Sequence, residues 1–545
     1  MVKICVSNEF FEIIERDVCG RIGKLYTKSG TIQTPTVLPV INPLKSLVKP
    51  SEIKELGFDA IVTNAYIIKK HFKDLGCNEI HRMLNFNGPI MTDSGAYQLL
   101  LYGSVDVHPN EIVKFQEEIS SDIAVILDVP TGITRDREKA LKTVEETLER
   151  ARACLNIRDN SKGILWVGPI QGGLHSDLIA YASREMSKLD YHIHALGSPV
   201  QLMENYEYAA LVDMIITAKA NMPANRPLHL FGAGHPSMLA LAVALGCDLF
   251  DSASYVLFAR DGRYITPHWT YRLENLSELP CNCPICSKIN ANELKELSKE
   301  ERERFLSLHN LYVIAQEIRL IKQSIAEGRL WEHVETRCRA HPKLFQAFKA
   351  LEKHRDYLEK HDPVTKGKEK GIFIYDKTSL IRPEVTRHVK RFLTRYRKPP
   401  QYNIAVLLPE PHEKPYHKDR IVKKLIKKVA KQKAHLIFYN PVFGLTPIEL
   451  DETFPLSQFE NSCSYQEAAE HMIQLFEEYA SKTLNAYTEV IIASIDETVD
   501  IAQKMLDICK NKSIKANIIC CRDYVQIPNS VAEILGTRYS VNGFR

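Results

Sequence analysis

Two aspartates stand at similar points in the sequence, each at the end of a short apolar run. Asp93 lies in the segment MTDSGAYQ and Asp251 lies in FDSASY. Two carboxylates that share a site can perform glycosidic chemistry, in which one attacks the anomeric carbon of a sugar and the other transfers protons. Tyr97, in the first segment, could stack on a planar base. The alternative is a local role for each aspartate, since both could cap helices.

Three cysteines within six residues, and a histidine 23 positions further on, have the residue types of a metal site. They are Cys281, Cys283, Cys286 and His309. Three thiolates and one imidazole form a closed tetrahedral site that suits Zn²⁺. A closed site leaves no position for water, so we expect a structural metal. By spacing alone the fourth ligand is open, because the chain also has His175, His192, His194 and His235. Three unpaired cysteines in a loop are the alternative.

Elements that could position these residues alternate along the first 270 positions. The expected strands are Ala60–Asn64, Pro89–Thr92, Ile123–Asp128, Ile164–Gln171, His192–Gly197, Pro227–Phe231 and Asp248–Asp251. Amphipathic stretches lie between them, at Pro109–Ser121, Arg137–Leu155, Ser176–Leu189 and Tyr206–Met222. About seven β-then-α units in this length are typical of a TIM (β/α)8 barrel. A doubly wound open sheet is the alternative.

Small, polar and acidic residues follow the apolar runs, in TDSGAYQ, LDVPTG, IQGG, ALGSP, FGAGHP and DSASY. In a barrel all of these segments face one mouth, where the chemistry of the fold takes place. The same residue types also form ordinary turns. In FGAGHP, Gly232 and Gly234 are followed by His235 and Pro236, so the segment does not fit a dinucleotide-binding loop.

The chain changes character after Pro280. A metal motif comes first, and a helical pattern then continues to about His361. The polar segment 361–371 reads as a linker. A second α/β pattern follows, with strands expected at Gly371–Tyr375, Asn403–Leu408, His435–Tyr439, Glu489–Ala493 and Lys515–Cys520. We therefore expect a domain at 1–360, which includes the zinc motif at 281–309, and a C-terminal α/β domain at 372–545.

Positive charge is concentrated in the second half of the chain. Residues 381–440 hold 16 Lys and Arg against 4 Asp and Glu, although the whole chain carries only +4. The segment 418–433 reads as an amphipathic basic helix, and 387–398 adds a second basic cluster. The outward lysines include Lys423, Lys424, Lys427 and Lys428. Such a surface can neutralise RNA phosphates, and a membrane surface or a solvated face are the alternatives.

Composition excludes several classes of protein. The 545 residues are 45% hydrophobic and 25% charged, an ordinary globular balance. The longest apolar run, near Met238–Cys247, is about half a membrane span, and the first residues have no apolar signal core. The 13 cysteines do not suggest a disulfide framework. We expect a cytoplasmic protein with no membrane helix.

These segments resemble the tRNA-guanine transglycosylase family, in the archaeal form that begins archaeosine synthesis. The segments are MTDSGAYQ, LDVPTG, IQGG, FGAGHP, DSASY and PCNCPIC with LHN. The resemblance runs from Met1 to about His361, and YNPVFGLTPIELDETFPLSQFE is similar to the extra C-terminal region of archaeal tRNA-ribosyltransferases. It implies a TIM barrel and an exchange, through a covalent ribosyl-aspartate, of guanine at position fifteen in the D-arm of tRNA. The incoming base would be 7-cyano-7-deazaguanine.

The resemblance implies a role for each matching residue. Asp251 matches the nucleophile and Asp93 the acid/base carboxylate, and both stay catalytic candidates because the DSG aspartate is sometimes given the first role. Asp128 would accept hydrogen bonds from the guanine-like edge, and Gln171 would donate to its carbonyl. The other expected contacts with the base come from Ser94, from the ring of Tyr97, and from backbone groups of Leu196, Gly197 and Ser198. The family usually has two glycines where this chain has Gly197 and Ser198.

Partners and alternatives follow from the same resemblance. The implied zinc ligands are Cys281, Cys283, Cys286 and His309. Related enzymes form homodimers, and many carry a tRNA-binding PUA domain that is not recognisable here. Either a separate PUA protein acts in trans, or the grip on the RNA is weaker or different. A catalytically silent or base-modifying paralogue that binds tRNA is the second hypothesis. A zinc-stabilised RNA-binding protein without chemistry is the third.

Overall fold

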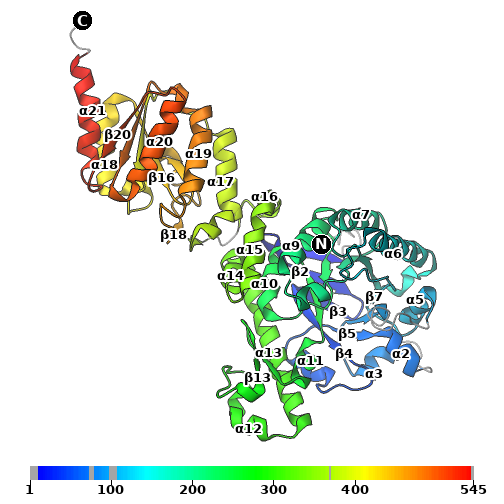
Figure 1. Cartoon of the computed structure of the whole chain (residues 1–545). Coiled ribbons are helices and arrows are strands. Elements are labelled where there is room, and N and C mark those ends of the chain that lie inside the picture. Colours follow the sequence, from blue (N-terminus) through cyan, green and yellow to red (C-terminus); the bar gives the residue numbers. More distant parts are fainter. Residues whose placement is uncertain (1–9, 73–78, 97–106, 367–369, 542–545) are drawn as a thin grey trace, which may run out of the picture. The chain divides into compact units, whose positions relative to one another are not determined.

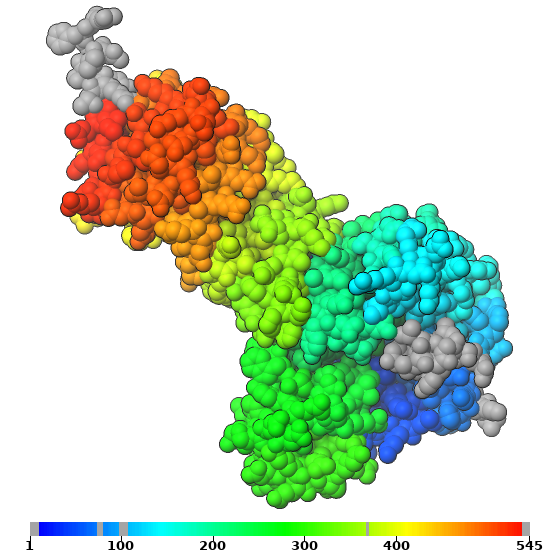
Figure 2. All heavy atoms as spheres, viewed as in Figure 1, coloured from blue at the N-terminus to red at the C-terminus, as the bar shows by residue number. Residues whose placement is uncertain are grey.

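The computed structural model describes residues 10–72, 79–96, 107–366 and 370–541. The chain forms two compact units, at residues 1–369 and 370–545. In Figure 2 the first unit runs from blue to yellow-green and the second from yellow-green to red. No helix within the described ranges is long and apolar enough to cross a bilayer. Tyr97 lies outside the described residues.

The first unit is built on a closed barrel of eight parallel strands, which confirms the expected fold and excludes the open sheet there (Figure 1). The strands are β4 (Thr36–Ile41), β5 (Ile61–Asn64), β6 (Ile90–Asp93), β7 (Ile123–Val125), β8 (Leu165–Ile170), β9 (Ile193–Leu196), β10 (Leu228–Leu230) and β11 (Leu249–Ser252). The strand β4 is absent from the sequence prediction. It pairs with both β5 and β11 and thereby closes the barrel.

Helices surround the barrel and follow its strands. They are α1 (Pro50–Glu55), α2 (Ala65–His71), α3 (Glu79–Leu84), α5 (Pro109–Glu118), α6 (Arg137–Ile157), α7 (Ser176–Ser187), α8 (Val200–Glu204), α9 (Tyr208–Ala220), α10 (Pro236–Ala244) and α11 (Ser254–Arg260). The strands read as continuous apolar runs because both of their faces are buried. One face packs under these helices, and the other fills the barrel with residues such as Leu38, Val62 and Val167.

A small antiparallel sheet, absent from the sequence prediction, covers the N-terminal end of the barrel. Its strands are β1 (Phe11–Asp17), β2 (Gly20–Thr27) and β3 (Gly30–Thr34). Phe11, Leu25 and Ile32 pack on the barrel interior. Arg21 donates to the buried Asp248, which directly precedes β11, with Nε 2.6 Å from Oδ1. The C-terminal mouth is therefore the end that this sheet leaves uncovered.

A hairpin and a helical region follow the barrel. The elements are β12 (Arg263–Ile265), β13 (Thr270–Arg272), α12 (Ala291–Glu296), α13 (Lys299–Ala326), α14 (Leu330–Cys338), α15 (Pro342–Ala350) and α16 (Arg355–His361). Ser298 and Glu301 form a capping box that starts the long helix α13. Beyond α16, Asp362 accepts a hydrogen bond from the Val18 N–H at 3.0 Å. The beginning of segment 361–371 is thus fixed on the first unit.

The second unit is a three-layer α/β structure. Its sheet has the order β17-β16-β15-β19-β20, with β15 (Ile404–Pro409), β16 (Ala434–Asn440), β17 (Gly444–Pro447), β19 (Glu489–Ser494) and β20 (Ala516–Cys520). The helices are α17 (Pro383–Arg395), α18 (Arg420–Val429), α19 (Ala469–Lys482), α20 (Val499–Asn511) and α21 (Ile527–Val541). One face of the sheet packs against α17, α19 and α20, and the other against α18 and α21.

Two strands of the second unit, β17 and β18, are absent from the sequence prediction, whereas the expected strand at Gly371–Tyr375 is present as β14. β14 (Ile372–Ile374) lies outside the main sheet and pairs with β18 (Phe459–Asn461). β17 was not predicted, and it pairs antiparallel with β16 through a tight turn. Asn440 holds that turn, because its side-chain oxygen accepts from the N–H groups of Val442 and Phe443 at 3.0 and 2.7 Å.

Candidate active site and metal centre

The candidate catalytic residues come from the C-terminal ends of different strands. Asp93 ends β6, Asp251 is in the last two residues of β11, and Leu196 ends β9. Asp128 and Gln171 follow β7 and β8 directly or within three residues. Parallel strands of a closed barrel bring such positions to one mouth. The structure therefore brings the predicted carboxylates and base-pocket residues together.

Asp93 is held in a pocket that raises its proton affinity. The Asn64 amide donates to its Oδ2 at 2.9 Å. Burial, and then the charges of Asp128 and Asp251, raise the pKa of Asp93 to about 7. A carboxyl group with this pKa can both donate and accept a proton near neutral pH, which is the property of a general acid and base.

Asp128 and Gln171 are bonded directly to each other. The Gln171 Nε2 donates to Asp128 Oδ2 at 2.5 Å, and both side chains are buried. The Gln171 Oε1 accepts from the Thr131 N–H at 3.0 Å. Burial raises the pKa of Asp128 to about 6, although the Gln171 hydrogen bond opposes the shift. The pair therefore presents a charged acceptor and an amide at neutral pH.

Gly197 and Ser198 shape the wall of this pocket. A Cβ atom on Gly197 would lie 2.1 Å from Gln171 Nε2, so only glycine lets the Gln171 side chain lie over the backbone there. Ser198 has a φ of 64°, a left-handed conformation in which glycine is usual. Its hydroxyl accepts from the Gly132 N–H at 3.0 Å and donates to Gln171 Oε1 at 3.1 Å. These bonds offset the strain of a serine at this position.

Two of the expected base contacts have their side chains turned into the fold. The Ser94 hydroxyl is buried and donates to the Ile126 carbonyl at 3.0 Å. The Leu196 side chain is completely buried. For both residues only backbone groups are available to a bound base. Tyr97, the expected stacking residue, lies outside the described residues.

Asp251 has its two carboxylate oxygens in different surroundings. Oδ1 lies 2.9 Å from His229 Nε2 and accepts from the Gly232 N–H at 3.0 Å. The described residues provide no hydrogen-bond partner for Oδ2, and the side chain is 19% exposed. One oxygen is therefore fixed and the other is available. Sequence reasoning missed His229 and Asn64, although both lie on strands that the sequence predicted.

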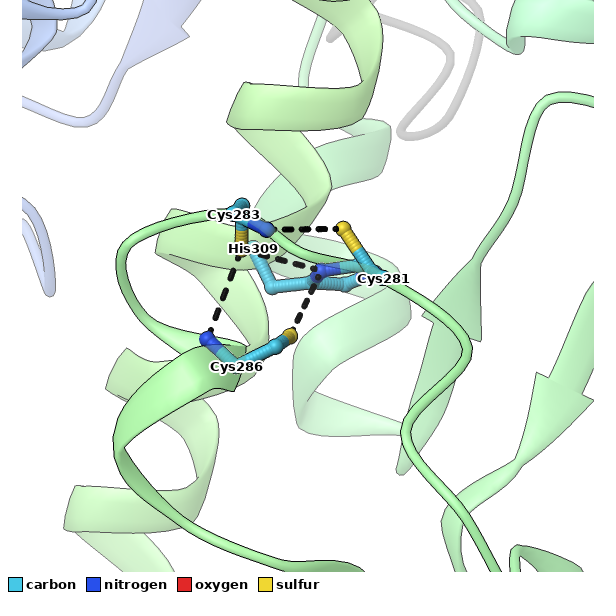
Figure 3. Close-up of side chains that lie close together, drawn as sticks. All are labelled: Cys281, Cys283, Cys286 and His309. Atoms are coloured by element: carbon cyan, nitrogen blue, oxygen red, sulfur yellow. Dashed lines mark hydrogen bonds between the residues drawn. The ribbon is translucent and has the colours of Figure 1, made fainter.

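The predicted metal ligands form a compact cluster (Figure 3). One ligand atom from each of Cys281, Cys283, Cys286 and His309 lies within 4.8 Å of the others. The His309 Nδ1 is 3.7 Å from Cys283 Sγ and 3.3 Å from Cys286 Sγ. Hydrogen bonds from the neighbouring thiols hold the pKa of Cys281 well below its usual range. Four converging N and S donors fit a tetrahedral metal ion.

Surrounding residues orient the histidine of this cluster. The His309 Nε2 lies 2.8 Å from the Ile265 carbonyl, so Nε2 carries the proton and Nδ1 faces the cysteines. The Tyr264 ring stacks on His309 with ring centres 3.6 Å apart, and its hydroxyl lies 3.3 Å from Cys286 Sγ. Figure 1 shows β13 and α12 beside α13, the helix that carries His309. The cluster thus joins the cysteine loop to the long helix.

The basic helix α18 presents its lysines to solvent. Its buried side is Val422, Leu425 and Val429, which pack on the sheet. Lys423, Lys424, Lys427 and Lys428 are all exposed. The Lys428 amine donates to Asn529. In the second basic cluster, by contrast, Arg387 and Phe392 are buried.

A closed parallel barrel with two carboxylates at its mouth fits an enzyme that acts on a glycosidic bond, and the Cys3His cluster lies in the same unit. The family model described as queuine tRNA-ribosyltransferase matches residues 17–343, and the chain belongs to that family. A second model, a domain of unknown function (DUF5591), matches residues 385–534.

Curated relatives support the same assignment. A protein of Sulfolobus acidocaldarius is 50% identical over 382 residues, which are 69% of this chain and 76% of the relative. A Pyrobaculum aerophilum protein is 44% identical over 488 residues, 89% of this chain and 95% of the relative. One from Saccharolobus solfataricus is 45% identical over 460 residues, 83% and 90%. All three are named tRNA-guanine(15) transglycosylase.

Proposed function

We propose that this enzyme exchanges guanine at position 15 of tRNA for 7-cyano-7-deazaguanine, the first step of archaeosine synthesis on the tRNA. The names of the relatives support the tRNA position. The observation that carries the proposal is the pairing at one mouth of Asp93, whose pKa is raised to about 7, with Asp251, which has one fixed and one available oxygen.

Each carboxylate has one part in the proposed reaction. Asp251 Oδ2 attacks C1′ of the ribose as the N-glycosidic bond breaks, and the electron pair of that bond goes to the departing guanine. Asp93, protonated, supplies the proton that the guanine needs. The incoming base then gives its proton to Asp93 and attacks C1′, which releases Asp251. One N-glycosidic bond replaces another, so no external energy source is required.

Base recognition is assigned to the Asp128–Gln171 pair. A guanine-like edge offers N–H donors, and charged Asp128 can accept them. Gln171 now donates to Asp128 at 2.5 Å. A bound base would replace that hydrogen bond, which frees the amide to donate to the base carbonyl. The backbone at Ser94, Leu196, Gly197 and Ser198 would line the rest of the pocket.

The Cys3His cluster is proposed to hold one structural Zn²⁺. All four ligands would be used, so the metal would cross-link the cysteine loop to α13 and would have no part in the reaction. The exposed lysines of α18 are proposed to contact tRNA phosphates. We further propose a cytoplasmic homodimer, which light scattering would detect as twice the chain mass of 62.2 kDa, and a separate PUA protein that assists in trans.

An exchange assay tests the proposed function. The purified chain is incubated with tRNA whose position-15 guanine is radiolabelled, and release of label is followed with and without 7-cyano-7-deazaguanine. Release that depends on the added base is expected. A chain that binds tRNA without releasing label would instead be a silent paralogue, and a chain that retains zinc and binds RNA of any kind would be a general RNA-binding protein. Added unlabelled guanine should also release label, because guanine is the leaving group of the same reversible step, whereas release with guanine but not with 7-cyano-7-deazaguanine would exclude the assigned incoming base.

A further inference from the structure

His229 contacts the proposed nucleophile from the neighbouring strand. β10 and β11 are parallel, with His229 opposite Leu249. Residues two positions apart share a face of a strand, so Asp251 points to the same side as His229. The imidazole is completely buried, and its Nε2 lies 2.9 Å from Asp251 Oδ1.

The surroundings of the His229 ring indicate which of its nitrogens carries the proton. A carboxylate oxygen can only accept, so Nε2 carries the proton and donates to Oδ1. Nδ1 is buried and has no hydrogen-bond partner within the described part of the chain. Phe231 packs edge-on against the ring, with centres 4.8 Å apart. A proton on Nδ1 would therefore be buried without an acceptor among the described residues.

We infer that His229 is a positioning residue, which with the Gly232 N–H holds Asp251 Oδ1 and leaves Oδ2 as the attacking atom. The inference rests on the proposed function. Two donors on Oδ1 fix the plane of the Asp251 carboxylate. The orientation of Oδ2 is then fixed as well, although Oδ2 itself has no partner among the described residues. No other described side chain donates to Asp251.

Donors on Oδ1 alone suit both halves of the reaction. During the attack they hold the carboxylate in place and leave Oδ2 free to reach C1′. When the ribosyl ester is cleaved, the bond between Oδ2 and C1′ breaks and its electron pair returns to the carboxylate. The N–H groups of His229 and Gly232 are then already in place to receive that charge.

Two substitutions separate the hydrogen bond from the shape of the ring. His229→Gln places an amide N–H near the position of Nε2. His229→Phe keeps a buried planar ring and removes the donor. The matched control is His194→Phe, since His194 is buried on the adjacent strand β9 and has no contact with either catalytic carboxylate. The measurements are kcat and KM for tRNA, the rate of covalent adduct formation, and the melting temperature.

The inference predicts a specific pattern. His229→Phe should lower kcat and the rate of adduct formation roughly 10- to 100-fold, the effect of losing a hydrogen bond to a charged group, with KM for tRNA unchanged. His229→Gln should recover most of that loss, and His194→Phe should leave kcat unchanged. A folded His229→Phe enzyme with wild-type kcat would overturn the inference, and so would a folded His229→Gln enzyme as slow as His229→Phe.

A third variant covers the case in which His229→Phe does not fold. His229→Asn carries the same amide as His229→Gln, but its side chain is one methylene shorter. Its N–H group reaches only the position of Nδ1 and not that of Nε2. It should therefore be slow while His229→Gln is fast, and equal rates would overturn the inference. The wild-type chain separates the two proposals. Without base exchange by wild type both fail, whereas exchange that is indifferent to His229 removes only the positioning role.

Discussion

At the scale of single residues, the chemistry of the site depends on which carboxyl group holds a proton and which carries a negative charge. Asp93 is destabilised as an anion, because burial and two neighbouring carboxylates raise its pKa to about 7. In the unfolded chain the pKa of the same group is about 4. The folded state therefore holds an extra proton between these values, and stability falls as the pH rises through them.

This difference predicts the effect of Asp93→Asn on stability. The variant removes the buried charge and keeps the acceptor for Asn64. It should be more stable than wild type by on the order of 2–4 kcal/mol above about pH 7, with the difference disappearing as the pH falls towards about 4. Urea unfolding across this range is the measurement. A variant that is no more stable than wild type at about pH 8 would show that Asp93 is not strained as an anion.

Gly197 gives a second prediction at the residue scale. Gly197→Ala places a methyl group 2.1 Å from the Gln171 amide, which is a flexible side chain and can move. The fold should survive, and KM for the incoming base should rise roughly tenfold because Gln171 no longer meets Asp128. Gly536→Ala, which adds a methyl group in open space, is the control. In a Gln171→Ala background Gly197→Ala should have no further effect, and a full additional loss there would contradict the account.

Sequence reasoning reached some of these residues and not others, for a physical reason. Asp93, Asp128 and Gln171 follow apolar strands, and the barrel rule places such positions at the mouth. His229 and Asn64 were not singled out, because a polar residue within or at the end of a strand does not reveal which partner the neighbouring strand will present. Ser94 was expected to contact the base; its hydroxyl donates to the Ile126 carbonyl, so the expected contact stays a prediction for its backbone.

At the scale of elements, the barrel and the metal loop could be predicted better than the small sheets. Period and spacing identify seven of the eight barrel strands. β4 was missed because its proline, Pro39, weakens a strand pattern. In the barrel Pro39 pairs with Ser252 of β11, and the next two residues of β4 pair with β5. β17 was missed because it is a short antiparallel return, and β18 because its pairing with the distant β14 depends on tertiary packing.

At the metal cluster we predict that a bound Zn²⁺ joins the cysteine loop to α13 and is needed for the stability of both. One Zn²⁺ per chain should be found, with X-ray absorption distances of about 2.3 Å to sulfur and about 2.0 Å to nitrogen. Cys283→Ala should lose the metal and most of the soluble protein. Tyr264→Phe is the matched control, because it keeps the ring stacked on His309 and should retain zinc. Full stability and activity of metal-free protein would rule out the structural role.

At the scale of the whole molecule, chemistry and charge are carried by different units. The carboxylates and the Cys3His cluster are in residues 1–369, and the basic segment 381–440 is in residues 370–545. The local excess of 16 Lys and Arg over 4 Asp and Glu is hidden in a net charge of +4. The division between units could be anticipated from the polar segment after His361, whereas the anchoring of Asp362 to Val18 depends on a contact between residues far apart in sequence.

The lysines of α18 give a prediction on this scale. Changing Lys423, Lys424, Lys427 and Lys428 to Gln should weaken binding to all tRNAs alike. The slope of log affinity against log salt should flatten by roughly 0.7 to 0.9 for each phosphate that is no longer neutralised. The fold should persist, since Val422, Leu425 and Val429 keep the helix docked. The control changes Lys504 and Lys510, on α20 at the other face of the sheet, and should leave the slope unaltered. An unaltered slope in the fourfold variant would place the tRNA elsewhere.

The central claim is that Asp251 attacks the ribose while Asp93 manages the proton. The most direct measurement is the trapping of a protein–tRNA adduct that survives denaturing electrophoresis, after tRNA is added without an incoming base. Wild type should form the adduct and lose it when 7-cyano-7-deazaguanine is added. Asp251→Asn should bind tRNA and form none, and Asp93→Asn should form it slowly. An adduct that persists in Asp251→Asn and disappears in Asp93→Asn would contradict the account and make Asp93 the nucleophile.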